Sequence, residues 1–276
     1  WEVTTLKPGP AEPPAPLVDH DVTALLARVR TPAPSASREL VVPVTQLHDF
    51  VACPRLFHFA HQVGLPSTPA PVTAHGLGRE HGIAAHRLLQ LTPLNLVGSP
   101  RLRPALLELQ RAERLDAQVV SLVERFWRSD FGLELAASSS RAHRELPFAL
   151  RLRGKPDLVM RGQLDVLLER DEELLVIDYK TTARTGLAAY RFQLACYALA
   201  ARRFRDDGRP VRTGVVFLLD DALEPVFEAV HVDEAALSQA AAAFAEAQRS
   251  GAWAGRERST CVELGCGYLA RCHGDL

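Results

Sequence analysis

The spacing of apolar residues first follows a helical period. Between residues 41 and 140 it predicts helices over 46–61, 76–91 and 101–131. Thr45 is placed to cap the first of these helices, and Leu47, Phe50 and Phe57 fall along one of its faces. The long third helix carries apolar residues from Leu102 to Phe126 at near-helical intervals. The first half of the folded region is therefore expected to be helical.

The middle of the chain changes to the period of a β-strand. Strands are predicted over 145–153, 157–169 and 174–179, and an acidic turn at 170–173 joins the last two. The remaining elements are a helix over 190–204, strands over 211–219 and 226–232, and an alanine-rich helix that Asp233 caps and that ends near residue 247. This order predicts an α/β domain with a central mixed sheet.

The first 40 residues have a different character. Seven prolines between Pro8 and Pro34 interrupt any regular element, apart from a short helix that is conceivable over 21–30. We expect this stretch to be a linker or tether, and residues 41–276 to form the folded domain. The chain begins at Trp1 and its only methionine is Met160, so we expect a piece of a longer protein.

Composition narrows the class of protein. The hydrophobic content of 47% and the net charge of -1 are typical of a globular chain in water. No apolar run is long enough for a transmembrane helix, and no signal peptide is visible, so we expect a cytoplasmic protein without membrane contact. The balanced charge means that any nucleic-acid contact must rest on local patches. Five cysteines indicate a metal site or buried thiols rather than disulfides.

Two carboxylates and a lysine stand near the ends of the predicted hairpin strands. Asp165 and Asp178 could hold one hard divalent cation, and Lys180 projects from the same strand face as Asp178. A metal polarises a phosphate and activates water, and an ammonium group steadies the developing charge, so this set suits phosphodiester hydrolysis. Ordinary surface charges on a hairpin are the alternative. The apolar run 174–177 weakens it, because a charge that ends a buried strand lies at the rim of the sheet.

Five motifs, in this order, resemble the RecB-like branch of the PD-(D/E)xK nuclease superfamily. They are Gly82-x-x-x-His86-x-x-Leu89, Glu145-Leu146-Pro147-Phe148, Gly162-Gln163-Leu164-Asp165, Asp178-Tyr179-Lys180-Thr181 and Gln193-x-x-x-Tyr197. The resemblance extends from about Val44 to the C-terminus. It implies a restriction-endonuclease-like core, a central mixed β-sheet flanked by helices, with an N-terminal helical portion. Residues 41–276 would then be a RecB-like nuclease domain.

The resemblance also implies roles for single residues. His86, Asp165 and Asp178 would bind Mg²⁺ or Mn²⁺, and the carbonyl of Tyr179 would add a ligand. Lys180 would orient the attacking water, Gln193 and Tyr197 would touch the phosphate or the lysine, and Glu145 would lie at the edge of the site. Taken singly, His86 is equally a partly buried helix residue, Glu145 a surface carboxylate, and the Gln193–Tyr197 pair a common helix pattern.

The cysteines bracket these motifs. Cys53 precedes them, and Cys261, Cys266 and Cys272 close the chain, whereas Cys196 lies within a predicted helix and is expected to pack there. Some RecB-like nucleases bind a [4Fe-4S] cluster through one early and three late cysteines, although the four-residue gap between Cys261 and Cys266 is wider than usual. A zinc site and plain unliganded thiols remain alternatives.

The resemblance therefore implies a metal-dependent DNA nuclease module, exonuclease or endonuclease, in the bacterial cytoplasm. It would be tethered to a recombination helicase of the AddAB, RecB or UvrD type, and a second protein of the same complex is a possible partner. The helicase would feed it single-stranded ends in double-strand break repair. The alternatives are a catalytically inactive DNA-binding or structural domain and a stand-alone nuclease of a CRISPR or defence system. Five arginines are candidate phosphate contacts: Arg55, Arg79, Arg87, Arg184 and Arg191.

Overall fold

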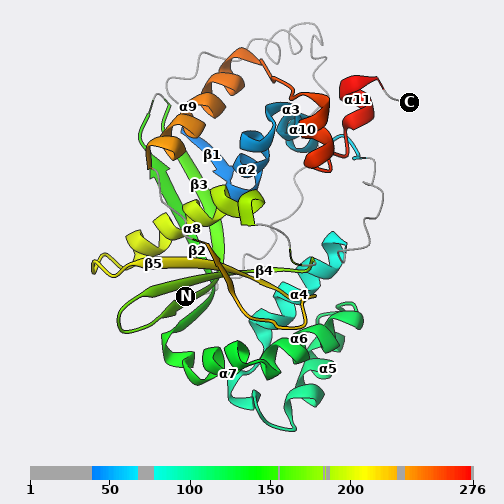
Figure 1. Ribbon diagram of the computed structural model, residues 1–276, viewed down its shortest axis with the longest axis vertical. Helices are drawn as coiled ribbons and strands as arrows, with labels where there is room; N and C mark the ends of the chain where they lie inside the picture. The colour runs from blue at the N-terminus through cyan, green and yellow to red at the C-terminus, as the bar shows by residue number, and fades with distance from the viewer. Residues whose placement is uncertain are drawn as a thin grey trace, which may run out of the picture. The chain divides into compact units, whose positions relative to one another are not determined.

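A six-stranded mixed β-sheet forms the centre of the computed structural model (Figure 1). The structure describes residues 39–67, 78–154, 156–182, 184, 187–228 and 234–274, all within the unit that starts at Glu39, and the side chains of Arg79 and Ala188 are not described. Apart from its last two residues, the tether predicted over 1–40 lies outside the described residues.

The sheet runs in the order β1-β3-β4-β5-β6, and β2 pairs with β3 outside this path. Its strands are β1 (Leu40–Pro43), β2 (Ala142–Leu152), β3 (Leu158–Glu169), β4 (Leu174–Lys180), β5 (Val211–Phe217) and β6 (Val226–Glu228). The pairs β1–β3 and β4–β5 are parallel, and β2–β3, β3–β4 and β5–β6 are antiparallel. The predicted mixed sheet is confirmed, whereas strand β1 was not predicted.

Strand β3 carries a fork in the sheet. Its residues Leu158–Arg161 pair with β1, and its residues Val166–Glu169 pair with β4, on the edge away from β2. Residues 162–165 between these stretches have no ladder partner on that edge among the described residues. Ligands in α/β folds bind where neighbouring strands diverge in this way. Strand β4, the second of the two predicted strands that carry a carboxylate, therefore ends at an opening in the sheet.

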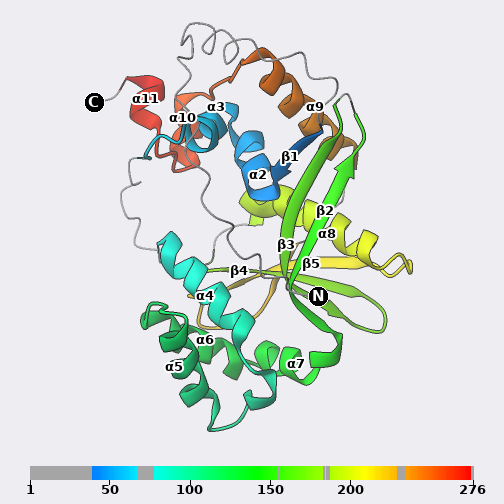
Figure 2. The ribbon, with the colours of Figure 1, turned by 180° about the vertical axis from the view of Figure 1, so that it is seen from behind.

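Helices cover the sheet in two groups (Figures 1 and 2). One group packs with Leu158, Met160 and Val176 in one core; it contains α2 (Val44–Ala52), α3 (Pro54–Phe57), α8 (Arg191–Phe204) and α9 (Glu234–Ser250). The other packs with Val166, Leu175 and Ile177 and contains α4 (Arg79–Leu91), α5 (Leu102–Ala112), α6 (Gln118–Arg128) and α7 (Asp130–Ala137). Neighbouring residues of β4 thus enter different cores, as the period of a strand requires.

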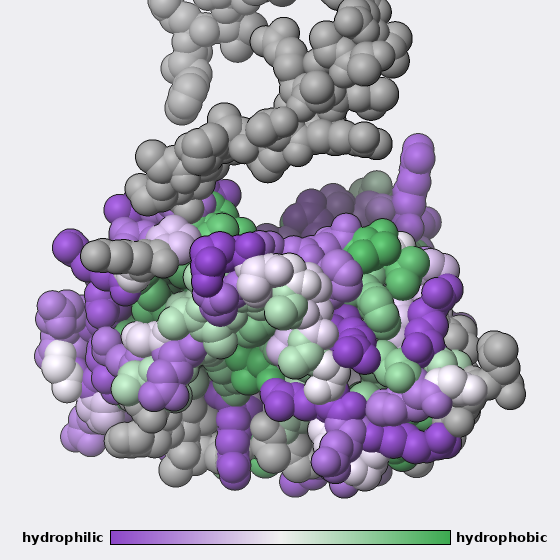
Figure 3. All heavy atoms as spheres, turned by 90° about the horizontal axis from the view of Figure 1, so that it is seen from above, coloured by the Kyte–Doolittle hydropathy of each residue, from purple (hydrophilic) through white to green (hydrophobic). Residues whose placement is uncertain are grey.

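Short elements complete the fold. They are η1 (His58–Val63), η2 (Leu94–Leu96), η3 (Ser139–Arg141), η4 (Leu187–Tyr190), α10 (Arg258–Glu263) and α11 (Leu269–His273). Seen from the end that carries α9, α10 and α11, the described surface is largely hydrophilic, with hydrophobic side chains in small areas (Figure 3). No helix in the described ranges is long and apolar enough to cross a bilayer.

Two predicted helices are divided in the structure. The helix expected over 46–61 breaks at Cys53, whose backbone is extended (φ -159°), because Pro54 disfavours a helical residue before it. Its first part begins at Val44, so Thr45 lies inside the helix and is not its cap; the N-cap is Pro43. The helix expected over 101–131 is three helices, and Arg114, with a positive φ of 54°, lies in the first break. The predicted cap Asp233 lies outside the described residues.

Candidate functional site

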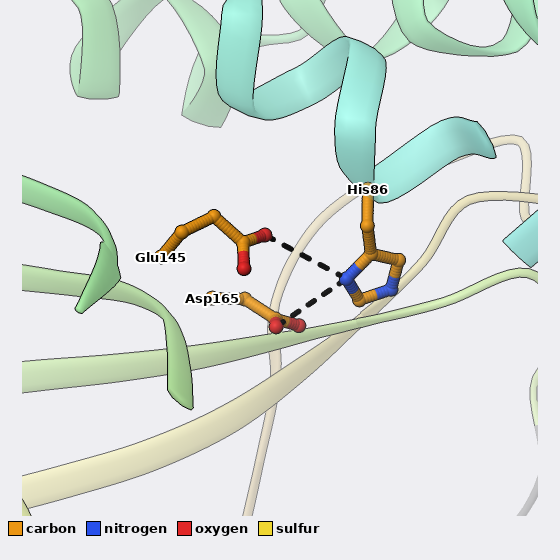
Figure 4. Close-up of side chains that lie close together, drawn as sticks. All are labelled: His86, Glu145 and Asp165. Atoms are coloured by element: carbon orange, nitrogen blue, oxygen red, sulfur yellow. Dashed lines mark ion pairs between the residues drawn. The ribbon is translucent and has the colours of Figure 1, made fainter. Parts of the chain in front are cut away.

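Three side chains from distant parts of the chain meet at the fork. His86 comes from the middle of α4, Glu145 from β2 and Asp165 from β3, and one ligand atom of each lies within 4.8 Å of the others (Figure 4). The Nδ1 atom of His86 lies 3.3 Å from Asp165 Oδ1 and 3.9 Å from Glu145 Oε1. An imidazole nitrogen and two carboxylates at such distances are a suitable donor set for a divalent cation.

The main chain of Tyr179 fixes two of these ligands. The His86 Nε2 atom lies 3.0 Å from the Tyr179 carbonyl, so a proton on Nε2 leaves Nδ1 free to face the carboxylates. The Tyr179 amide donates to Asp165 Oδ2 at 2.7 Å. The carbonyl that was expected to bind metal is therefore the hydrogen-bond partner of His86 in the structure. One residue of β4 sets the orientation of both side chains.

A second polar group adjoins the first. Lys180 Nζ lies 2.7 Å from Asp178 Oδ2, and the Gln193 amide donates to Asp178 Oδ1 at 3.2 Å and to the Tyr197 hydroxyl at 2.7 Å. The lysine is also 3.4 Å from Gln193 Oε1 and lies over the ring of Tyr190 at 5.0 Å. Gln193 and Tyr197 are one turn apart on α8, so both reach the end of β4. Asp178 and Lys180 thus share a strand face, as predicted.

Burial and crowding perturb the charges of this region. Burial, together with the neighbouring Asp165, raises the pKa of Glu145 to about 7. Burial also raises the pKa of Asp178, against the opposing effect of Lys180. Burial lowers the pKa of His86, but Asp165 and the other carboxylates outweigh it and raise this pKa to about 9. The carboxylates of Glu145 and Asp178 thus lack sufficient compensating positive charge, which a hard divalent cation would supply.

Glu145 reaches the site through an unusual backbone conformation. Its φ is 52°, in the left-handed region that costs a residue with a Cβ about 1–2 kcal/mol. The Gln163 amide donates to its carbonyl at 3.0 Å. Next to it, Arg144 donates to the carbonyls of Leu89 (2.8 Å) and Thr92 (3.0 Å), at the end of α4. These bonds hold Glu145 and the helix of His86 together, and such local strain is typical of functional sites.

The glycines of two motifs permit close approaches. A Cβ on Gly82 would lie 3.1 Å from Thr181 Oγ1, so this glycine lets α4 pass close to the end of β4 one turn before His86. A Cβ on Gly162 would lie 2.4 Å from Cζ of Phe148. The ring of Phe148 therefore occupies the space above Gly162.

The structure brings the predicted site residues together. A hollow of about 470 Å³ is lined by seven of them: His86, Glu145, Asp165, Asp178, Lys180, Gln193 and Tyr197. The grouping differs in detail from the expected ligand set, because Asp178 pairs with Lys180 while Glu145 joins His86 and Asp165. Residues that the sequence reasoning missed also line this hollow, among them Thr45, Arg161 and Gln163.

The cysteines share a region away from this hollow. Burial raises the pKa of the Cys261 thiol, and so do the nearby thiols of Cys266, Cys53 and Cys272. Cys53 and Cys261 are buried, and the other two are partly exposed. Within the described ranges, no three of these thiols lie close enough to share a single metal ion. Cys196 is buried in α8, as expected, and burial raises its pKa to about 12.

Comparisons with known proteins identify the family of the chain. The model of the family described as PD-(D/E)XK nuclease superfamily matches residues 42–273. An ATP-dependent helicase/nuclease subunit from Streptococcus sanguinis (strain SK36) is 35% identical over 135 residues, which are 46% of this chain and 11% of that protein. The protein of the same description from Ligilactobacillus salivarius (strain UCC118) is 30% identical over 160 residues, 50% of this chain and 13% of that protein.

The chain thus spans only about a tenth of the length of these curated relatives. Among solved structures, that of SSO0001 aligns with 92% of this chain and 94% of its own, at 14% sequence identity and a TM-score of 0.42.

Proposed function

The chain belongs to the PD-(D/E)XK nuclease superfamily, and we propose that it is a metal-dependent nuclease that hydrolyses phosphodiester bonds of DNA. The observation that carries the proposal is the group of His86, Glu145 and Asp165 beside the Asp178–Lys180 pair. Ligands for a hard cation and a lysine at one fork of the sheet are the parts that this reaction needs.

The donor set fits Mg²⁺ or Mn²⁺. His86 Nδ1 and the carboxylates of Glu145 and Asp165 would hold the ion, with Asp178 on the side of the lysine. A divalent cation in this place supplies Lewis-acid polarisation of the scissile phosphate and lowers the pKa of the attacking water. The Tyr179 carbonyl would act by holding the imidazole of His86 in place, as well as through any direct contact with the ion.

The other residues position the reactants. Burial tends to lower the pKa of Lys180, but Asp178 outweighs it and raises this pKa, so the side chain stays an ammonium group that can orient water or the phosphate. Gln193 holds Asp178 and Tyr197 from α8, which fixes the rotamer of the carboxylate next to the lysine. In the hydrolysis, a water oxygen forms a bond to phosphorus and loses a proton, the bond between phosphorus and the leaving sugar oxygen breaks, and that oxygen takes a proton.

Mutation of the two groups tests the proposal. Asp165→Ala and Lys180→Ala should each abolish cleavage of single-stranded DNA in Mg²⁺ while the circular dichroism spectrum stays unchanged. Asp171→Ala is a matched control, because this carboxylate lies in the turn of the same hairpin and its side chain is 90% exposed. Cleavage by Asp165→Ala at the rate of the control would overturn the assignment. DNA binding without cleavage by the unmodified chain would favour the inactive DNA-binding domain.

The cellular role is part of the same proposal. Both curated relatives are described as ATP-dependent helicase/nuclease subunits, which supports a helicase motor in cis, single-stranded ends as substrate and a role in double-strand break repair and recombination in the bacterial cytoplasm. A second protein of the same complex is an expected partner. A stand-alone defence nuclease is the alternative, and a nuclease assay on the parent protein with and without ATP distinguishes the two.

The four cysteines carry a separate proposal, an iron–sulfur cluster. Its support is the neighbourhood of Cys261, whose thiol lies near those of Cys53, Cys266 and Cys272. A four-iron cluster holds its thiolates further apart than a single zinc ion does. It therefore suits thiols that lie near one another but, in the described ranges, too far apart for three of them to share one ion. Anaerobically purified protein should be brown and contain iron. Colourless protein free of iron from that preparation would exclude the cluster.

A further inference from the structure

The hollow that holds the metal ligands continues toward the N-terminus of α2. Thr45, Arg161 and Gln163 line this part, together with the first residues of the helix. Arg161 is the last residue of β3 that pairs with β1, and its partner there is Pro43, the residue before the helix. The arginine, the fork and the start of α2 are therefore adjacent. Arg161 and the start of α2 lie beside the group of His86 and Asp165 and take no part in it.

Arg161 differs from the arginines that the sequence suggested as phosphate contacts. Three of those are already engaged: Arg55 with the Trp253 carbonyl (3.4 Å), Arg87 with Glu113 (2.9 Å) and Arg184 with Asp220 (2.5 Å). Arg191 also has a partner, and the side chain of Arg79 is not described. Arg161 is exposed, and among the described residues no carboxylate pairs with it. Its charge is available to a ligand.

The start of α2 adds to this positive field. The helix has no capping side chain and no acidic residue in its first turn, so its first amide groups are not satisfied by a side chain. The positive end of the helix dipole lies at this part of the hollow, and no acidic residue in the first turn of the helix offsets it. Thr45 is exposed in the first turn, and its hydroxyl has no hydrogen-bond partner within the described ranges. The first amides of α2 and the Thr45 hydroxyl support an anion-binding site here. The main evidence for this site is the guanidinium of Arg161, which is unpaired among the described residues and lines the hollow.

We propose that Arg161, assisted by Thr45 and the first amides of α2, binds a backbone phosphate of the strand being cut, next to the phosphate at the metal ligands. This subsite rests on the proposed nuclease function. Arg161 lies four positions before Asp165 on β3, about 13 Å along an extended strand. The two residues therefore serve different phosphates, and the DNA strand follows β3 from the fork toward β1.

The chemistry favours a phosphate over a base. Arginine presents a planar fork of donors that matches two phosphate oxygens. Arg161, Thr45 and Gln163 line this part of the hollow, and none of the three carries an aromatic ring on which a base could stack. Binding at this subsite should therefore depend on charge and on salt, and it should be independent of base sequence.

The salt dependence of binding tests the subsite without relying on cleavage. All variants are made in the 276-residue chain carrying Asp165→Asn, and binding of a fluorescent single-stranded oligonucleotide is measured over a range of salt. Arg161→Gln should weaken binding and reduce the slope of log K against log salt by about 0.7, the share of one phosphate contact on a single strand. Arg161→Lys should recover part of the slope. The matched control is Arg202→Gln, which replaces an exposed arginine near the C-terminal end of α8.

Cleavage then locates the phosphate. In chains with Asp165 intact, one linkage of the oligonucleotide at a time is replaced by an uncharged methylphosphonate. One position beside the cut should raise KM for the unmodified chain and have no further effect on Arg161→Gln. Equal salt slopes for Arg161→Gln and Arg202→Gln would overturn the subsite, even if the chain cleaves DNA. A chain that does not cleave, yet shows the reduced slope, would refute the nuclease and retain the subsite.

Discussion

The free-energy cost of bringing the metal ligands together can be measured at Glu145. Its carboxylate pKa is raised from an ordinary value of 4.5 to about 7, first by burial and then by Asp165. An acid with a raised pKa in the folded state contributes stability below pH 4.5, and this contribution is lost as the pH rises through about 7. At pH 8 and without divalent ions, the ionised Glu145 should therefore destabilise the fold. Glu145→Gln removes the charge and keeps the shape.

The magnitude follows from the pKa shift. The interval between 4.5 and about 7 corresponds to about 3 kcal/mol at about 1.4 kcal/mol per pKa unit. Solvent screening at a side chain that is 14% exposed reduces this to about 1–2 kcal/mol. In a domain of this size each kcal/mol shifts Tm by about 2–4 °C. Glu145→Gln should thus raise Tm by about 2–8 °C at pH 8 in EDTA, with little change at pH 4.5.

A second substitution at this position tests the backbone strain separately from the carboxylate charge. Glycine in a strand normally costs about 0.5–1 kcal/mol. At position 145 it also removes the left-handed strain, with φ 52°, which is worth about 1–2 kcal/mol for a residue with a Cβ. Glu145→Gly should therefore be at least as stable as Glu145→Gln. A clearly lower Tm for the glycine variant would show that the conformation is not strained.

The assay is thermal unfolding followed by circular dichroism, at pH 4.5 and pH 8, in EDTA and in excess Mg²⁺. Magnesium should stabilise the unmodified chain more than Glu145→Gln, because the ion compensates the carboxylate charge. The difference in Tm between the two proteins at pH 8 should therefore disappear. Glu108→Gln, which replaces an exposed glutamate on α5, is the control. An equal difference in Tm between Glu145→Gln and the unmodified chain at both pH values would refute the electrostatic reasoning.

Three further outcomes test other parts of the structure. The hydrogen bond with Arg205, followed by other cationic partners, lowers the pKa of Glu169 to about 2, so Glu169→Gln should cost about 1 kcal/mol at pH 7, and in acid unfolding its deficit should vanish between pH 4.5 and 2. A deficit independent of pH would contradict this. Tyr197→Phe should lower kcat about tenfold by loosening the α8 amide that holds the acid–lysine pair, with KM unchanged; a rise in KM alone would assign the hydroxyl to substrate binding. Gly162→Ala places a Cβ 2.4 Å from the Phe148 ring and should cost about 1–3 kcal/mol in urea unfolding. Phe148→Leu should restore part of this loss, and independent effects would exclude the clash.

Local sequence signals predicted the hairpin well. Strand β4 was expected at 174–179 and runs from Leu174 to Lys180, because an unbroken apolar run followed by charge marks a buried strand that ends at a rim. The same signal located Asp178 and Lys180, whose contact of 2.7 Å depends on residues only two apart. The helix α8 was found for the same reason, whereas the pair of Gln193 and Tyr197 on it was marked by the resemblance to the family. A local period suffices where the interacting groups are neighbours in sequence.

Helix boundaries were less predictable, because single residues set them. Apolar spacing continues through Cys53 and through Arg114, yet both positions interrupt a helix. Pro54 was visible in the sequence and its effect on the preceding residue could have been anticipated. The left-handed backbone of Arg114 had no comparable local signal. Periodicity therefore predicted which segments are helical better than where each helix ends.

The composition of the site depends on pairings between distant residues. Glu145 lies opposite Asp165 because β2 and β3 are antiparallel, and Arg161 lies beside the start of α2 because it pairs with Pro43, more than a hundred residues earlier. A motif marks a residue but does not give these distances. Arginines near the motifs were chosen by their position in the sequence, and those with a described side chain already have partners. Arg161, an arginine without a partner among the described residues, lies at the fork instead, where β3 leaves β1 and the hollow opens beside the metal ligands.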